Sequence, residues 1–262
     1  GIPAILSINS FSNTNFKKNK EVLVFRNDHE LVKLVKFLVK FKQANKISPI
    51  IKRLFFLNNE PIWKYLTAKL ATDGNRPDLA IWVSKRASRD GVYLIDNGYP
   101  IIKMPRLRQF GKTLELEKAL VLALIRQESE FKQNAISSAS SRGLMQLLPS
   151  TAKNVARRLK INYSKKMLNE NREYNLLLGQ AYLYDILRKY DNSYILALAA
   201  YNAGPKQVKR WIKKFGDPRN SQIDSIDWIE KIPFYETRNY IQRVIENLQV
   251  YRYRLLGKGH PL

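Results

Sequence analysis

The chain has 262 residues, of which 45% are hydrophobic and 11% aromatic, enough apolar surface for one large or two ordinary folded domains. It carries 46 Lys and Arg against 22 Asp and Glu, and this net charge of +24 favours anionic partners such as nucleic acid, anionic lipid or an acidic wall polymer. With no Cys and only His29 and His260, the composition excludes a disulfide framework and disfavours a Ser-His-Asp triad, and we expect neither a metal ion nor a cofactor.

The first hundred residues carry the patterns of successive helical hairpins. Residues 1–20 are rich in Ser, Asn and Lys, and we expect them to be loosely ordered. From Asp28, which can serve as an N-cap, apolar residues recur at helical spacing through Leu38. Proline suits the first turn of a helix, which predicts three further helices. Their expected ranges are 48–57, 61–71 and 77–87.

A cluster of turn-forming residues at 96–100, followed by Pro105, predicts a domain boundary near residue 105. We therefore expect an N-terminal helical region over residues 1–105 and a second domain over residues 106–262.

The second domain is also expected to be helical. Thr113 can cap a helix that carries Glu115 and Glu117 in its first turn and runs to about Glu130. No alternating strand pattern stands out, so the sequence predicts an all-α fold. Further helices are expected at 149–159, 173–190, 194–201, 205–215 and 235–255.

The segment 119–131, ALVLALIRQESEF, places two acids at the end of an apolar run. At 100° per residue, Glu128 lies on the apolar face beside Leu124 and Ile125, whereas Glu130 lies on the other side. A carboxyl group held against apolar side chains has its charged form destabilised, so its pKa rises and it can act as a general acid. Glu128 could equally bend out to solvent or pair with a lysine, and this segment alone leaves both interpretations open.

Three later segments combine turn residues with hydrogen-bonding side chains. The first, SSASSRGLMQ at 137–146, is a small polar loop whose glycine permits close approach of a ligand to the backbone. The second, AYNAGP at 200–205, ends one helix and begins another, and the turn itself does not need its tyrosine or asparagine. The third, IPFYETRNY at 232–240, is an aromatic-rich helix start with an acid in its first turn. Taken singly, each segment can also be explained as a turn or helix start.

In this order and spacing, the four segments resemble the soluble lytic transglycosylase family, whose catalytic domain is related to the goose-type lysozyme fold. The resemblance covers about residues 106–256, and residues 25–105 resemble, in pattern only, the helical repeats that precede this domain in the family. The matching motifs are Gln127-Glu-Ser129, Gly143-Leu-Met-Gln146, Ala200-Tyr-Asn-Ala-Gly204 and Pro233-Phe-Tyr-Glu-Thr-Arg-Asn-Tyr240.

The resemblance implies cleavage of the β-1,4 bond between N-acetylmuramic acid and N-acetylglucosamine in peptidoglycan. Glu128 would protonate the glycosidic oxygen and then act as base while the muramic acid O6 attacks the anomeric carbon, leaving a 1,6-anhydro end. Because the nucleophile belongs to the substrate, one catalytic carboxyl group suffices where hydrolases usually use two. The implied substrate-binding residues are Ser129, Gly143, Met145, Gln146, Tyr201, Asn202, Glu236 and Tyr240.

The roles within this set differ. The resemblance implies that Ser129 orients the catalytic carboxyl group or contacts substrate, that Tyr201 stabilises developing positive charge or orients the sugar, and that Glu236 supports the site. The family usually carries Gly-Ala where this chain has Ser140 and Ser141, a departure that is expected to reshape the loop.

Peptidoglycan glycan strands are the implied partner, with association with the wall or a membrane surface left open and the oligomeric state undetermined. The implied location is the periplasm or cell envelope. The chain begins at Gly1 without a leader, so we expect that a signal peptide has been removed. The apolar runs at 119–125 and 194–201 are far shorter than the roughly 20 residues of a membrane span.

Two other function classes compete with this one. Residues 194–215 form a pattern of helix, glycine turn and basic helix, which on a strongly basic chain is typical of nucleic-acid binding. However, Val208 and Trp211 form a core-facing stripe, so the cations of 206–214 are expected to be a solvated face, and we expect no physiological nucleic-acid partner. The third class, a non-catalytic peptidoglycan-binding module, is disfavoured by the presence of Glu128.

Overall fold

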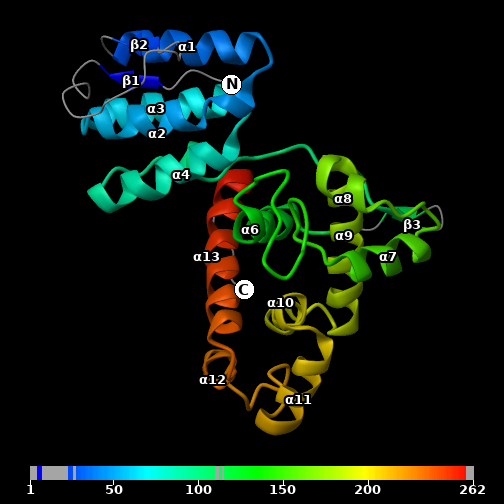
Figure 1. Cartoon of the computed structure of the whole chain (residues 1–262). Coiled ribbons are helices and arrows are strands. Elements are labelled where there is room, and N and C mark those ends of the chain that lie inside the picture. The colour runs from blue at the N-terminus through cyan, green and yellow to red at the C-terminus, as the bar shows by residue number, and fades with distance from the viewer. Residues whose placement is uncertain (1–4, 8–22, 26–27, 110–111, 114, 258–262) are drawn as a thin grey trace. The chain divides into compact units, whose positions relative to one another are not determined.

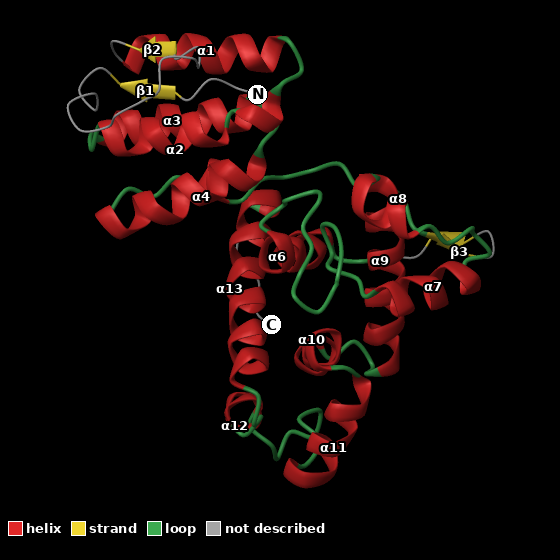
Figure 2. Ribbon diagram, in the orientation of Figure 1, coloured by secondary structure: helices red, strands yellow, loops and turns green. Residues whose placement is uncertain are grey.

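The computed structural model describes residues 5–7, 23–25, 28–109, 112–113 and 115–257. The chain separates into two compact units, Gly1–Pro100 and Ile101–Leu262. Figure 1 traces the elements from the N-terminus to the C-terminus, and Figure 2 shows how far helices dominate both units.

Unit 1 is a series of helices in which each packs against its neighbour in sequence, as the hairpin pattern predicted. The prolines at 61 and 77 occupy the first position of their helices, and Pro49 the second of its own, where a missing backbone N–H costs nothing. The helices are α1 (Asp28–Lys40), η2 (Ala44–Lys46), α2 (Ser48–Leu57), α3 (Pro61–Asp73), α4 (Pro77–Ala87), η3 (Ser88–Asp90) and α5 (Ile95–Gly98).

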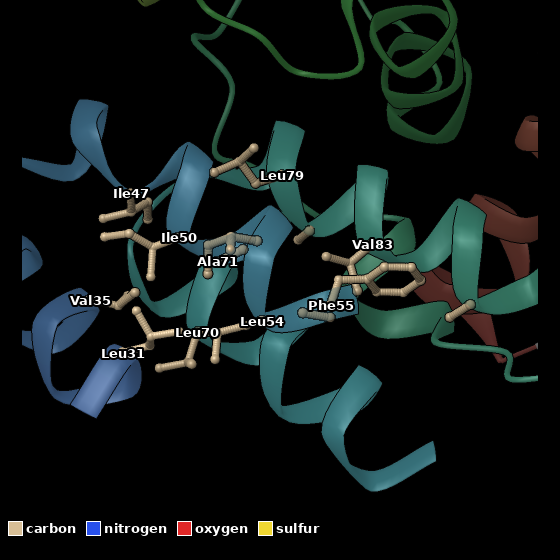
Figure 3. Close-up of a cluster of buried hydrophobic side chains, with 14 residues drawn as sticks. Leu31, Val35, Ile47, Ile50, Leu54, Phe55, Leu70, Ala71, Leu79 and Val83 are labelled. Carbon is tan, nitrogen blue, oxygen red and sulfur yellow. The ribbon is translucent and has the colours of Figure 1, made fainter. Parts of the chain in front are cut away.

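Apolar side chains from α1 to α4 make the core of unit 1. Leu31 and Val35 of α1 meet Ile50 and Leu54 of α2, and Figure 3 shows these side chains pointing toward those of α3 and α4. Their spacing along each helix is three or four residues, so each helix contributes one apolar stripe.

Unit 2 is built around two helices that lie side by side, α6 (Lys118–Ser129) and α13 (Tyr235–Leu256). They run antiparallel, because Glu117, just before α6, bonds to Arg252 near the end of α13, whereas Glu128, near the end of α6, bonds to Tyr240 near the start of α13. Of the other helices, α10 (Tyr194–Ala203) and α12 (Ser225–Glu230) pack against α13. α9 (Arg172–Lys189) and α11 (Pro205–Phe215) pack against α10, and α7 (Pro149–Arg158) and α8 (Lys165–Glu170) pack against α9.

The all-α prediction is confirmed, since the described residues hold only four strands of two or three residues each. β1 (Ile5–Ser7) pairs in parallel with β2 (Leu23–Phe25), and β3 (Arg108–Gln109) pairs in antiparallel fashion with β4 (Lys112–Thr113). Apart from β1, the expected loose segment at 1–20 lies outside the described residues. None of the helices in the described ranges is long and apolar enough to cross a bilayer.

The predicted start of the α6 helix is wrong. Thr113 lies in β4, and α6 begins five residues later at Lys118. Glu117 occupies the N-cap position without capping the helix, because its carboxylate accepts hydrogen bonds from Arg252 and Tyr194. The short helices α5, α8 and α12 were not predicted, and α5 occupies the segment that was expected to be a turn.

Candidate active site

Glu128 lies in the last turn of α6, just after a stretch of the helix that is buried all round. The side chains from Ala119 to Ile125 are all at most 3% exposed, so over these residues the expected apolar stripe extends to every face of the helix. The helix packs along α13, and its last residue, Ser129, is hydrogen-bonded to the loop that follows it. Glu128 and Glu130 are both half-buried, so exposure alone does not distinguish them.

What distinguishes Glu128 is its hydrogen-bond partner and its electrostatic environment. The hydroxyl of Tyr240, itself 5% exposed, donates to Oε1 of Glu128 over 2.5 Å. Burial of the carboxyl group raises the pKa of Glu128 from 4.5 to about 8, although the Tyr240 hydrogen bond acts in the opposite direction. At neutral pH this carboxyl group is therefore mostly protonated and able to donate a proton.

Glu236 lies in the first turn of α13 and is exposed. Its negative charge is a further cause of the raised pKa of Glu128, because two like charges disfavour ionisation of the buried one. Glu236 therefore acts on Glu128 through its charge.

Ser129 connects α6 to the loop that follows it. Its hydroxyl donates to the backbone carbonyl of Leu144 over 2.8 Å and also lies 3.2 Å from the carbonyl of Ile125 in its own helix. The serine next to Glu128 thus holds the loop residues 143–146 against the end of α6.

Gly143 is needed by the protein's own packing. Its φ of +75° is in the left-handed region, and a Cβ there would lie 2.2 Å from Nδ2 of Asn175 and 2.6 Å from the carbonyl oxygen of Leu168. The space that a side chain at this position would need is therefore filled by an asparagine side chain of α9.

Met145 and Gln146 follow in the same loop. The side chain of Met145 is fully buried, whereas that of Gln146 is half-buried and held by its neighbours. Gln146 Nε2 donates to the Gly143 carbonyl over 2.7 Å, and its Oε1 accepts from Ser141 over 2.8 Å. The serine that departs from the family pattern therefore fixes the orientation of the Gln146 amide.

Tyr201 and Asn202 lie at the end of α10, where they bind two other segments of unit 2. The Tyr201 hydroxyl donates to the carbonyl of Met145 over 2.7 Å, and burial raises its pKa well above the usual value. The charge of Glu128 is the next cause, which brings Tyr201 into the electrostatic reach of that carboxyl group. Asn202 accepts a 2.7 Å hydrogen bond from Thr237, which ties the end of α10 to the start of α13.

The structure thus brings Glu128, Tyr201 and Tyr240 into electrostatic reach of one another, and Ser129 and Tyr201 both bind the loop 143–146. Sequence reasoning missed Asn175 and Gly179 of α9, both of which contact this loop. A glycine in the middle of the long helical pattern 173–190 was the available signal, because it weakens a helix unless something packs against it.

Two hollows in unit 2 help to delimit the site. A cavity of about 860 Å³ between α10, α12 and α13 is lined by none of the predicted site residues and is mostly apolar, with the paired Arg252 at its edge. A hollow of about 440 Å³ is lined by Tyr182, whose ring packs 5.3 Å from that of Tyr201. The second hollow therefore reaches Tyr201 through this ring contact.

Comparison with known proteins identifies the class of unit 2. A family model described as "Transglycosylase SLT domain" matches residues 107–223, and one described as "Soluble lytic transglycosylase helical domain" matches residues 231–259. The second match includes α13, whereas we expected the helical repeats of the family within residues 25–105.

Two curated relatives illustrate the similarity. The soluble lytic murein transglycosylase of Escherichia coli K12 is 30% identical over 160 residues, which are 61% of this chain and 24% of that protein. A relative in Haemophilus influenzae is 40% identical over 134 residues, 51% of this chain and 22% of that protein. The chain therefore spans about a quarter of the length of these relatives.

Solved structures agree with the fold. The 70 kDa soluble lytic transglycosylase of Escherichia coli superposes with a TM-score of 0.71 and 25% identity, covering 90% of this chain and 38% of that one. The lytic transglycosylase Slt of Pseudomonas aeruginosa gives a TM-score of 0.68 and 26% identity, with 89% and 38% covered. The chain belongs to the soluble lytic transglycosylase family.

Proposed function

We propose that this protein is a lytic transglycosylase that cleaves the β-1,4 bond between N-acetylmuramic acid and N-acetylglucosamine in peptidoglycan and leaves a 1,6-anhydromuramic acid end. The observation that carries the proposal is the environment of Glu128. A single carboxyl group, raised by burial to a pKa of about 8 and held by Tyr240, is suited both to give a proton at neutral pH and to take one back.

Each step then balances with this one group. Protonated Glu128 gives its proton to the glycosidic oxygen as the bond from that oxygen to the anomeric carbon breaks. The muramic acid O6 hydroxyl attacks the same carbon, and the Glu128 carboxylate takes the O6 proton, so a new C1–O6 bond forms and no water is consumed. Because the attacking hydroxyl is part of the substrate, its effective concentration is high without a second protein carboxylate.

The surroundings of Glu128 support the same chemistry. The hollow beside Tyr201 offers the ring of Tyr182 together with polar side chains such as Asn154 and Thr151, and sugars bind to such mixtures of flat apolar faces and hydrogen-bonding groups. The net charge of +24 favours a polymer that bears carboxylates, as peptidoglycan stem peptides do.

The names of the relatives point in the same direction. The Escherichia coli relative is described as a soluble lytic murein transglycosylase. The Pseudomonas aeruginosa structure is of an inactive variant in which one glutamate is changed to glutamine. We place this protein in the periplasm or cell envelope, where its substrate lies, and assign it no physiological nucleic-acid partner.

The test is product analysis on purified peptidoglycan sacculi. The full chain should release fragments whose muramic acid end is lighter by one water than a hydrolysis product, and Glu128→Gln should abolish their release while keeping the fold. Reducing-end fragments would mean that water is the nucleophile and that the protein is a hydrolase. Absence of any release by the folded wild-type chain would contradict the proposed activity.

A further inference from the structure

Asn175 of α9 has a buried polar side chain, and its hydrogen bonds are made with other segments of the chain. Its side chain has no exposed surface. Its Oδ1 accepts from the backbone N–H of Met145, and its Nδ2 donates to the carbonyls of Arg142 and Leu168, each over 2.9 Å. Both hydrogens of the amide group are therefore used, and two of the three bonds hold the loop on either side of Gly143.

Gly179 lies one helical turn further along the same face of α9. A Cβ at this position would lie 2.2 Å from Sδ and 2.7 Å from Cβ of Met145. The missing side chain of Gly179 thus makes the space in which the Met145 side chain is buried. Together, Asn175 and Gly179 form a seat for the loop, one by hydrogen bonds and the other by shape.

The opposite side of this loop is bound by residues next to the reacting carboxyl group. Ser129, the neighbour of Glu128, donates to the carbonyl of Leu144, and Tyr201 donates to the carbonyl of Met145. The backbone at 144–145 is therefore held from α6 and α10 on one side and from α9 on the other. A displacement of the loop at α9 would have to move these two hydroxyl groups or break their bonds.

We propose that Asn175 and Gly179 are positioning residues that set the loop 143–146, and through it Ser129, Gln146 and Tyr201, for binding of the glycan. This inference rests on the proposed function. Neither residue touches the reacting atoms, so their effect on the reaction passes through the loop.

The proposal is tested by glycan binding in the full chain that carries Glu128→Gln, in which no cleavage interferes. The probe is a soluble, uncrosslinked peptidoglycan glycan oligomer. Asn175→Asp keeps the acceptor for Met145 but loses both donors, and Gly179→Ala places a methyl group where the Met145 side chain lies. We expect each variant to weaken binding of the oligomer by about tenfold, which corresponds to about 1.4 kcal/mol of binding free energy.

Asn97→Asp is the matched control. Asn97 is a buried asparagine of unit 1 that donates to Thr72, so the same substitution should lower the melting temperature without changing the dissociation constant. A purely structural role for Asn175 would give this same result. Folded Asn175→Asp and Gly179→Ala variants that bind within about twofold of the parent would therefore overturn the proposal.

The outcomes for folding and for the proposed function are separable. If Asn175→Asp does not fold, Gly179→Ala decides alone, and failure of both to fold would count against positioning and for a general packing role. If the wild-type chain releases no anhydro fragments and the Glu128→Gln chain binds no oligomer, the proposed function fails. Normal release by the wild type together with unimpaired variants would reject the present inference alone.

Discussion

Tyr240 donates its hydroxyl hydrogen to Oε1 of Glu128, joining α13 to α6 across 112 positions of the sequence. This bond opposes the effect of burial. Burial raises the pKa of Glu128, the bond to Tyr240 lowers it, and the result is a pKa of about 8. Under the proposed mechanism, Tyr240 therefore keeps the pKa of this carboxyl group in the range in which it can both lose and regain a proton.

Replacing Tyr240 by phenylalanine should move the alkaline limb of the activity profile to higher pH. In the proposed mechanism the active form has Glu128 protonated, and loss of the hydrogen bond that favours its ionised form raises its pKa further. The rate at neutral pH should nevertheless fall by about tenfold, because the carboxyl group loses its orienting partner. Initial rates of anhydro-fragment release from pH 5 to pH 10 would show both effects, and a limb that moves to lower pH would contradict this account.

Glu236→Gln is expected to move the same limb in the opposite direction. The charge of Glu236 raises the pKa of Glu128, so its removal lowers that pKa and activity is lost at a lower pH. Because Glu236 is exposed, salt should screen the effect. The wild-type and variant profiles should therefore converge as the salt concentration rises, and a separation that is insensitive to salt would point to a direct contact.

Glu128→Gln should stabilise the fold, and more so at higher pH. The pKa of Glu128 is about 8 in the folded chain against an ordinary 4.5, so between these values the folded state binds more protons and wild-type stability falls as pH rises. Glutamine does not titrate, and its advantage should grow from little at pH 5 to about 4 kcal/mol at pH 8. Urea unfolding of both proteins at the two pH values measures the difference.

Glu130→Gln provides the control for this variant. Glu130 lies just past the end of α6, and we expect near-normal activity and no comparable gain in stability at pH 8. A loss of activity as large as that of Glu128→Gln would overturn the assignment of the catalytic carboxyl group.

Much of the helical framework was predictable because its signals are local. Pro77 and Pro205 start helices that end where the apolar pattern ends, and α4 and α11 have the predicted bounds. In α11, Val208 and Trp211 are buried and the cations of 206–214 face solvent, as the stripe indicated. Periodicity and prolines are read within one helix, so no knowledge of the rest of the fold was needed.

The site could be predicted only in part, because its bonds join distant segments. Motif resemblance named Glu128 and Tyr240, but only the fold brings their side chains into contact. Glu117 was expected inside a helix. It instead pairs with Arg252, 135 positions away, and α6 begins only at the next residue, Lys118. Asn175 was not predicted as a site residue, because no feature of the neighbouring sequence indicates that its amide binds a loop some 30 positions earlier.

Ser140→Gly should stabilise the chain by about 0.5–1 kcal/mol, since a non-glycine residue in the left-handed region is strained by roughly that amount or more. Ser140 has a φ of +66° and is exposed, so the substitution removes strain without opening a cavity. Thermal unfolding of the variant and the wild type measures the change. Ser141→Ala is the matched comparison: it should leave stability closer to that of the wild type and should weaken glycan binding, because it removes the hydrogen bond to Oε1 of Gln146 and leaves only the bonds of Nε2 to orient that amide.

Arg252→Met should lower the free energy of unfolding by about 3 kcal/mol, because it removes the ion pair between Arg252 and the partly buried carboxylate of Glu117. The guanidinium donates through Nε over 2.6 Å and through Nη2 over 2.9 Å, and Tyr194 adds a third bond to the same carboxylate. Adding Glu117→Gln should recover a large part of the loss, since the negative charge of Glu117 is then removed as well. Below the melting temperature the single variant should keep most of its activity, because Tyr240 and the bond from Arg126 to Asn247 still hold the other end of α6 against α13. Urea unfolding with parallel rate measurements tests both points, and an additive double variant would show that the three-residue cluster does not act as a unit.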